Sequence, residues 1–116
     1  MQPHEFVASL RRVTRQSVTS TVDYLANPPV PEPPGYLGEF ARWWKGLSDQ
    51  QRVVARDLLE YVAEGSLFHL LTVLDGTSTL EGHEGTFELF HVIGESRTRL
   101  NDPDENLLCD LFNNTG

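Results

Sequence analysis

Four histidines and one cysteine are the residues of this chain best suited to metal, acid–base or nucleophilic chemistry, and their spacing does not assemble a known site. These residues are His4, His69, His83, His91 and Cys109. None of the histidines stands in an H-E-x-x-H pattern or at the Cys/His spacing of a zinc site. His69 lies inside an apolar segment, which favours a hydrogen-bonded core residue. The sequence therefore predicts no resident metal and no cofactor.

The turn around His83 is the weak exception to this pattern. Glu81 and Glu84 stand on either side of His83 in a glycine-flanked turn, and the three side chains together are a candidate for weak cation binding. Glu88 and His91 differ in parity along a predicted strand, so they point to opposite faces of it and cannot jointly hold a metal. An enzyme would need His83 or His91 in a pocket beside a carboxylate, and this alternative stays open.

Nucleophilic catalysis needs an activated cysteine or serine, and the chain shows neither pattern. Cys109 has no Cys–His signature around it and is interpreted as a small, half-buried apolar residue of the last helix. No serine stands in a G-x-S-x-G context. A single cysteine also excludes an intramolecular disulfide, which predicts a reducing compartment and a cytoplasmic location. We therefore expect a protein that is not an enzyme.

Charge is distributed unevenly along the chain. Through Leu58, seven basic residues stand against six acidic ones; from Leu59 onward, two basic residues stand against eleven acidic ones, for a net charge of −8. The acidic half is expected to repel nucleic-acid phosphates and to attract a cationic partner. The basic strip of Arg11, Arg12 and Arg15 is interpreted as a solvated helix face or as internal pairing with the acidic half. No apolar run approaches the roughly 20 residues of a membrane helix, so no membrane association is expected.

Apolar periodicity predicts an α+β fold, with about four helices followed by a small antiparallel β-hairpin or three-stranded sheet and a short C-terminal helix. The parts of this predicted single domain (1–116) are an N-terminal helix (1–26), a proline-rich connector (27–35), a helical core (36–76), a hairpin region (77–101) and a C-terminal helix (102–116). Within the helical core the expected helices cover residues 37–45, 48–64 and 67–74.

Local signals place the ends of these helices. Ser48 and Gln51 match a capping box that opens the second helix of the core, and Gly65 is expected to end it. The segment 67–74 is apolar nearly all round, which predicts a central, buried helix. Asp102 is the expected N-cap of the last helix. The core leucines and valine expected from these patterns are Leu10, Val54, Leu58, Leu70, Leu71, Leu74, Leu89, Leu100, Leu108 and Leu111.

The hairpin is expected between residues 86–93 and 96–100, with a third short strand near residues 77–81. Gly94-Glu95 fits a type II′ turn because glycine stands first. The two-residue loop predicts the cross-strand pairs Ile93–Ser96, Val92–Arg97, His91–Thr98, Phe90–Arg99 and Leu89–Leu100. The face with Leu89 and Ile93 is expected to meet the core, and the arginine stems are expected to cover Phe90 and Val92.

Trp43 and Trp44 are the second feature that could mark a binding surface. Adjacent residues on a helix are about 100° apart, so one tryptophan is expected in the core and the other partly exposed, unless both lie along a groove. An exposed tryptophan is a common interface anchor. Trp44 is our candidate for that anchor.

Four stretches resemble the C-terminal part of small bacterial proteins of the immunity or antitoxin type. They are residues 73–76 (VLDG), 87–92 (FELFHV), 100–103 (LNDP) and 111–113 (LFN). Their motifs are a helix stop, a hairpin and an N-capped final helix. The resemblance implies an α+β fold and a protein that binds and neutralises a partner.

The resulting expectation is a non-catalytic, acidic protein-binding module whose partner is a basic protein. The candidate partner-binding residues are Trp44 and the acids of turns and cap regions, namely Asp75, Glu81, Glu84, Glu95, Asp104 and Glu105. Self-association as a small regulatory or oligomerisation protein is the main alternative. A small enzyme and an acidic DNA mimic are the lesser ones.

Overall fold

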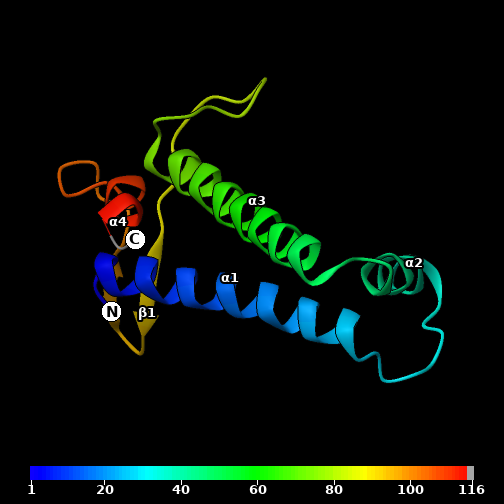
Figure 1. Cartoon of the computed structure of the whole chain (residues 1–116). Helices are drawn as coiled ribbons and strands as arrows, with labels where there is room; N and C mark the ends of the chain where they lie inside the picture. The colour runs from blue at the N-terminus through cyan, green and yellow to red at the C-terminus, as the bar shows by residue number, and fades with distance from the viewer. Residues whose placement is uncertain (115–116) are drawn as a thin grey trace. The chain divides into compact units, whose positions relative to one another are not determined.

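The computed structural model describes residues 1–114 and is an α+β fold, as expected (Figure 1). Its elements in chain order are α1 (Pro3–Ala26), α2 (Gly35–Lys45), α3 (Asp49–Asp75), β1 (Phe90–Ile93), β2 (Ser96–Arg99) and α4 (Leu108–Asn114). The C-terminal segment expected over residues 102–116 thus ends two residues outside the described part. The chain divides into two compact units, which we call the helical unit (residues 14–63) and the terminal unit (residues 1–13 and 64–116). Our assignment of a single domain stays a prediction.

The helix α3 is continuous, so the predicted stop at Gly65 is wrong. Gly65 is not among the glycines with positive φ, and it lies in the middle of the helix. A glycine ends a helix when it takes up the left-handed conformation at the C′ position, and Gly76 does this with φ +79°. The N–H of Gly76 donates to the carbonyl of Val73, and that of Thr77 donates to the carbonyl of Thr72. This pair of bonds is a Schellman motif, and it fixes the true end of α3.

The start of α3 confirms the predicted capping box. The N–H of Ser48 donates to Oε1 of Gln51 at 2.8 Å, and the N–H of Gln51 donates to Oγ of Ser48 at 3.1 Å. Two backbone donors that a helix start leaves free are thereby satisfied.

The strands β1 and β2 form a two-stranded antiparallel sheet with the predicted register. Phe90 pairs with Arg99, and Ile93 pairs with Ser96. Gly94 has φ +57° and Glu95 has no positive φ, which fits the expected type II′ turn. The guanidinium of Arg97 lies 4.3 Å from the centroid of the Phe90 ring, as predicted, but Val92 is exposed and is not covered in the same way. Ile93, expected to meet the core, is also exposed because it stands at the tip of the hairpin. Residues 77–81, expected as a third strand, form turns and irregular structure instead.

The last helix begins later than predicted. Oδ1 of Asp102 accepts a hydrogen bond from the N–H of Asp104 at 2.9 Å, so this carboxylate closes a turn of the loop and does not cap a helix. α4 begins six residues later, at Leu108. Pro103 and the acids beside it favour a helix start, but the loop over residues 102–107 is anchored by its own turn.

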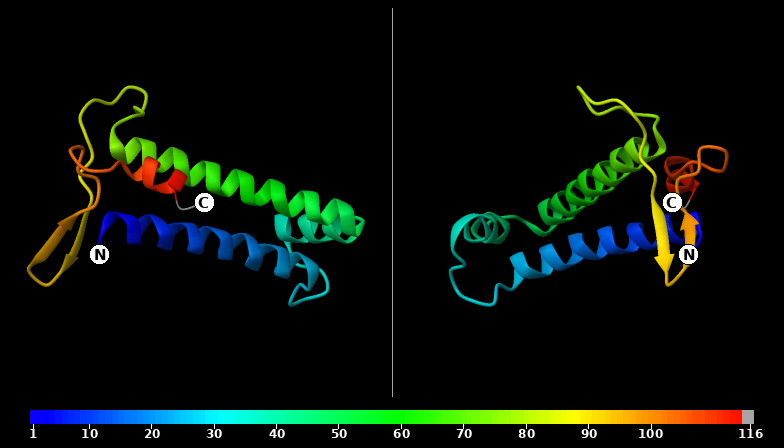
Figure 2. Two further views of the ribbon diagram at one scale, coloured as in Figure 1. Left: turned by 60° about the vertical axis from the view of Figure 1, so that its left-hand side comes forward. Right: turned by 180° about the vertical axis from the view of Figure 1, so that it is seen from behind.

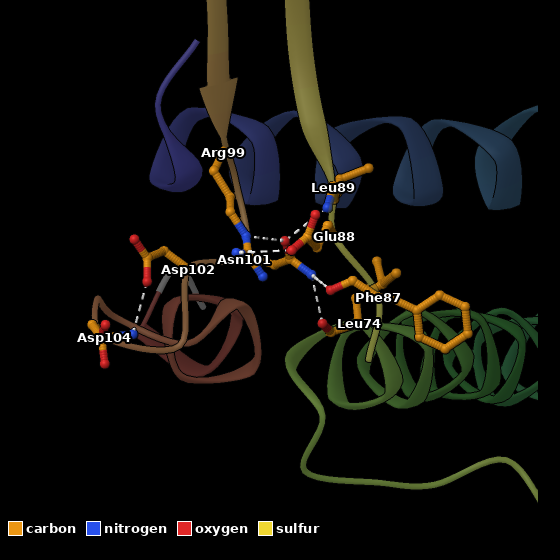
Figure 3. A network of polar contacts seen from close by, with 8 residues as sticks. All are labelled: Leu74, Phe87, Glu88, Leu89, Arg99, Asn101, Asp102 and Asp104. Atoms are coloured by element: carbon orange, nitrogen blue, oxygen red, sulfur yellow. Dashed lines mark hydrogen bonds and ion pairs between the residues drawn. The ribbon is translucent and has the colours of Figure 1, made fainter. Parts of the chain in front are cut away.

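Asn101 ties the end of α3 to the hairpin of the terminal unit (Figure 3). Its Nδ2 donates to the carbonyls of Leu74 at 2.7 Å and Phe87 at 2.9 Å. Its Oδ1 accepts from the N–H of Leu89 at 2.8 Å and from Nε of Arg99 at 3.3 Å. The side chain is buried and makes four bonds, so it replaces strand pairing where β1 has not yet begun.

The core of the terminal unit is a cluster of apolar side chains with one buried arginine. Its buried members are Val7, Leu71, Leu108, Cys109 and Phe112. Arg11 lies over the Phe112 ring at 3.9 Å and donates to the Phe112 carbonyl at 3.1 Å. Of the predicted basic strip, Arg11 is therefore an internal partner of the C-terminal segment and not a solvated residue.

The core of the helical unit joins α1, α2 and the first half of α3. Its buried members are Val18, Val22, Leu25, Ala41, Trp44 and Ala55. Arg15 and Glu60 join α1 to α3 through an ion pair of 3.3 Å, and Arg56 donates to the hydroxyl of Thr19 at 2.9 Å. Gly38 of α2 lies against the carbonyl of Pro33, where a Cβ would collide with it, so the proline-rich connector is fixed against the helix it precedes.

The core prediction was correct at three positions and wrong at three. Leu71, Leu100 and Leu108 are buried, and Leu10, Leu74, Leu89 and Leu111 are half-buried. Val54, Leu58 and Leu70 are exposed. The apolar arc of α3 is therefore only partly covered by the elements that pack against it in each unit.

Candidate functional site

The histidines are not brought together by the structure. His69 is exposed on α3, so its assignment to the core is wrong. His83 is exposed in the loop after α3, and His91 is half-buried in β1. Among residues 1–114, no group of three or more histidine, cysteine, aspartate or glutamate side chains is placed to hold a metal ion.

Cys109 is a buried thiol with an acid beside it. Burial raises the pKa of the Cys109 thiol above its ordinary value, and the hydrogen bond to Asp75 and the charge of that carboxylate raise it further. A nucleophilic cysteine needs the opposite environment, with exposure and a neighbouring cation. The thiol is thus held in its neutral form as part of the core.

The candidate acids lie in three separate places of the terminal unit. Glu81 and Glu84 belong to the loop over residues 76–89, Glu95 is at the hairpin turn, and the pair Asp104 and Glu105 is in the loop before α4. These three segments extend in different directions in each view (Figures 1 and 2). These five acids are therefore exposed, but they do not form one compact cluster.

Asp75, the sixth candidate acid, has a structural role. Its two carboxylate oxygens accept hydrogen bonds from the backbone N–H groups of Leu108 at 2.9 Å and Cys109 at 2.8 Å. These are the first two residues of α4, whose N–H groups have no partner inside the helix. The carboxylate caps α4, which leaves it little capacity for an external partner.

A cavity of about 550 Å³ in the terminal unit is lined by side chains of both charges. Arg97 covers the Phe90 ring, and Arg99 forms an ion pair of 3.6 Å with Glu88. Both arginines that line the cavity are engaged in holding the hairpin, and the other polar residues that line it include His4, Thr98, Asp102 and Glu105. The cavity is a surface hollow among the start of α1, strand β2, the loop over residues 102–107 and α4.

Trp44 is the buried tryptophan of α2, and Trp43 is the exposed one. The side chain of Trp44 is 4% exposed and that of Trp43 is 53% exposed. Trp44 therefore belongs to the core of the helical unit, and the exposed aromatic candidate is Trp43. Tyr36 and Phe40 continue the same exposed stripe at helical spacing, with ring centroids 6.1 Å apart.

An apolar ridge runs along the exposed side of α3 in the helical unit. Val54, Leu58 and Tyr61 are 58%, 60% and 78% exposed, and they follow one another at spacings of four and three residues. Residues at this spacing share one face of a helix. We call these three side chains the α3 ridge. A partner helix could pack against these three side chains.

A groove of about 280 Å³ lies beside the ridge, between α1 and α3 of the same unit. The residues that line it are all uncharged, namely Ser17, Val18, Thr21, Leu59, Val62 and Ala63. The hydroxyl of Thr21 already donates to the carbonyl of Ser17 at 2.9 Å, so the α1 wall presents small side chains with a satisfied polar group. We call this the α1–α3 groove.

The sequence pattern placed Val54 and Leu58 in the predicted core, and only the self-association alternative left the wide apolar arcs free to meet a second copy of the chain. The predicted wide apolar arc of residues 48–64 is real, but only part of it is covered. A signal was available: an arc of that width on a helix with few covering elements leaves apolar residues exposed.

Comparisons with protein-family models, with curated proteins and with solved structures find no match to this chain. The resemblance of the C-terminal segment to immunity or antitoxin-type proteins therefore stays a prediction. Within residues 1–114, no helix combines the length and the apolar character needed to cross a membrane.

Proposed function

We propose that this protein is a non-catalytic protein-binding module whose main binding surface is the apolar face of the helical unit. The observation that carries the proposal is the α3 ridge, in which Val54, Leu58 and Tyr61 are each more than half exposed. Contiguous apolar side chains on a protein surface mark interaction sites, whereas single ones need no explanation. The face includes both a ridge and a groove, so a partner could interlock with it by shape.

A protein partner fits this face better than a small molecule does. Small-molecule sites are enclosed and have a few convergent polar groups that fix the orientation of a ligand. The α1–α3 groove is lined by aliphatic side chains and two hydroxyl residues, and the Thr21 hydroxyl is occupied within α1. An apolar helix placed in such a groove gains contacts at several points along its length.

The environment of the reactive groups supports a binding role over catalysis. A catalytic thiol has a lowered pKa, whereas burial and Asp75 raise that of Cys109. His83 and His91 stand on different segments, one in an exposed loop and the other in a strand.

Site-specific photo-crosslinking in the native host tests the proposal. A photoreactive phenylalanine analogue in place of Tyr61, on the ridge, is expected to form an adduct with a protein. The same analogue in place of Ile93 is the control, because Ile93 is 67% exposed but lies at the hairpin turn of the terminal unit. The absence of any protein adduct at position 61 would overturn the proposal.

Binding of a basic partner to the terminal unit, as an immunity or antitoxin-type protein would do, is a second candidate. It is favoured by the charge of that unit, in which four basic residues stand against eleven acidic ones. Complementary potentials speed encounter and select partners. A partner recovered from the host by pull-down should be basic, and its association rate should fall as salt rises and with Glu81→Lys and Glu84→Lys. A rate indifferent to both changes would exclude this candidate.

A further inference from the structure

We infer that the apolar face of the helical unit is occupied by a second copy of this chain. The inference rests on the proposed function and names the partner. In the inferred dimer, the α3 ridge of each copy fills the α1–α3 groove of the other. Two equal contacts related by a two-fold axis would close the assembly.

The face carries both halves of such a contact. The ridge is formed by Val54, Leu58 and Tyr61, and Val62, one helical turn beyond Leu58, lies on the groove wall. Ridge and groove are therefore neighbours on one helix. An isologous interface requires a surface that is complementary to itself, and a ridge beside a groove meets that requirement. Helices pack by placing the ridges of one into the grooves of the other.

The exposed apolar area of α3 is comparable to the apolar part of one side of a standard interface. The exposed parts of Val54, Leu58, Leu59, Tyr61 and Val62 amount to on the order of 500 Å² of apolar surface. A standard interface takes about 800 Å² from each partner, of which somewhat more than half is apolar. α3 by itself thus supplies the apolar part that a stable dimer needs, and the small side chains of α1 supply a wall for the incoming ridge.

The distribution of charge permits two copies to meet at this face. The chain has a net charge of −8, but the helical unit holds five basic residues against six acidic ones. The groove is lined by uncharged residues, and so is the ridge. Most of the like charge that would separate two copies belongs to the terminal unit. Added salt should therefore leave the dimer intact or strengthen it, since screening weakens repulsion and does not weaken apolar contact.

Sedimentation equilibrium of the purified full chain is the primary test. The expected mass is twice the 13.1 kDa of one chain, and the midpoint of thermal unfolding is expected to rise with protein concentration. Leu58→Asp should weaken the dimer by at least about tenfold, since it places a charge at the centre of an apolar contact. Ile93→Asp is the matched control and should leave the mass unchanged. A monomer throughout the micromolar range, or a dimer that survives Leu58→Asp, would overturn the inference.

A mixing experiment tests the reciprocal geometry. Ser17→Arg places a long side chain in the groove at an exposed position, so it should block the dimer without disturbing the core. Each variant alone should be largely monomeric. In a mixture, the intact ridge of the Ser17→Arg chain meets the intact groove of the Leu58→Asp chain, so one of two contacts is restored and a heterodimer of intermediate affinity should form. Two variants that do not associate when mixed would contradict the two-fold ridge-and-groove arrangement.

The two proposals fail in different ways. A monomeric purified chain that still crosslinks from position 61 to another protein would retain the proposed function and reject the second copy. A chain that neither dimerises nor crosslinks at position 61 would reject both.

Discussion

Asp75, the last residue of α3, caps the start of α4, because its carboxylate accepts a 2.8 Å hydrogen bond from the backbone N–H of Cys109. α4 has only seven residues and would not persist as an isolated helix. It persists because Leu108 and Phe112 are buried and because an acid far away in sequence satisfies its first N–H groups. An acid that its position at a helix end assigned to a binding surface thus stabilises the fold.

Removing the Asp75 carboxylate should destabilise the protein. Asp75→Ala leaves two N–H groups of α4 without their acceptors, and the expected loss is about 1–2 kcal/mol in the free energy of unfolding. Urea denaturation followed by circular dichroism measures it. Glu81→Ala, at an exposed loop position, should change the free energy of unfolding little. An unchanged midpoint for Asp75→Ala would show that the cap is not formed in solution.

The buried thiol should make stability depend on alkaline pH. The pKa of Cys109 is raised in the folded state above its ordinary value of 9.0, so the folded chain keeps its proton where the unfolded chain loses it. The corresponding stabilisation is complete below about pH 9 and is lost as pH rises through the folded pKa. Cys109→Ala should therefore flatten the decline in the free energy of unfolding between neutral pH and about pH 10. Parallel pH profiles for the two proteins would contradict the assigned environment.

Asn101 should be among the most sensitive polar positions of the chain. Asn101→Ala leaves the Leu74 and Phe87 carbonyls and the Leu89 N–H without their partner, and the expected loss is about 2–4 kcal/mol. Asn106→Ala, at an exposed position of the next loop, is the control and should be close to neutral. Hydrogen exchange of the Leu89 amide offers a local measurement, because its bond to Asn101 is 2.8 Å long. Slow exchange retained in Asn101→Ala would be inconsistent with this bond.

Two neighbouring leucines of α3 should respond differently to truncation. Leu71 is fully buried, so Leu71→Ala should cost about 2–5 kcal/mol from lost transfer energy and the cavity left behind. Leu70 is 53% exposed, and Leu70→Ala should cost less than about 1 kcal/mol. Equal losses in thermal or chemical unfolding would mean that α3 is rotated relative to the structure described.

The local signals of the sequence predicted local geometry well. The Ser48–Gln51 capping box and the hairpin register depend on residues close together in the chain, and both are confirmed. Burial depends on what covers each face, which periodicity does not contain. The pattern of α3 marks an apolar arc, and the exposed side chains of Val54 and Leu58 show that part of it has no neighbour within its unit.

Long-range polar contacts were also beyond a reading of the sequence. The carboxylate of Asp75 meets α4 across more than thirty residues, and Asn101 meets Leu74 across 27. Neither contact has a spacing rule, because the intervening loops set the distance. For the same reason Asp102 matched an N-cap by type and position, although its side chain closes a turn of the loop.

The conformation of Gly65 distinguishes a continuous α3 from the two helices that the sequence suggested. A Cβ at Gly65 meets nothing within 4 Å, and the residue has no positive φ, so Gly65→Ala should stabilise the protein by about 0.5–1 kcal/mol. At a helix end with left-handed backbone the same change destabilises, and Gly76→Ala, at φ +79°, is the matched comparison with an expected loss of about 1 kcal/mol. Both are best measured by urea denaturation in a Leu58→Asp background, so that association at the neighbouring ridge does not contribute. If Gly65→Ala destabilised the protein as much as Gly76→Ala, the helix would have to break at residue 65, as the sequence suggested.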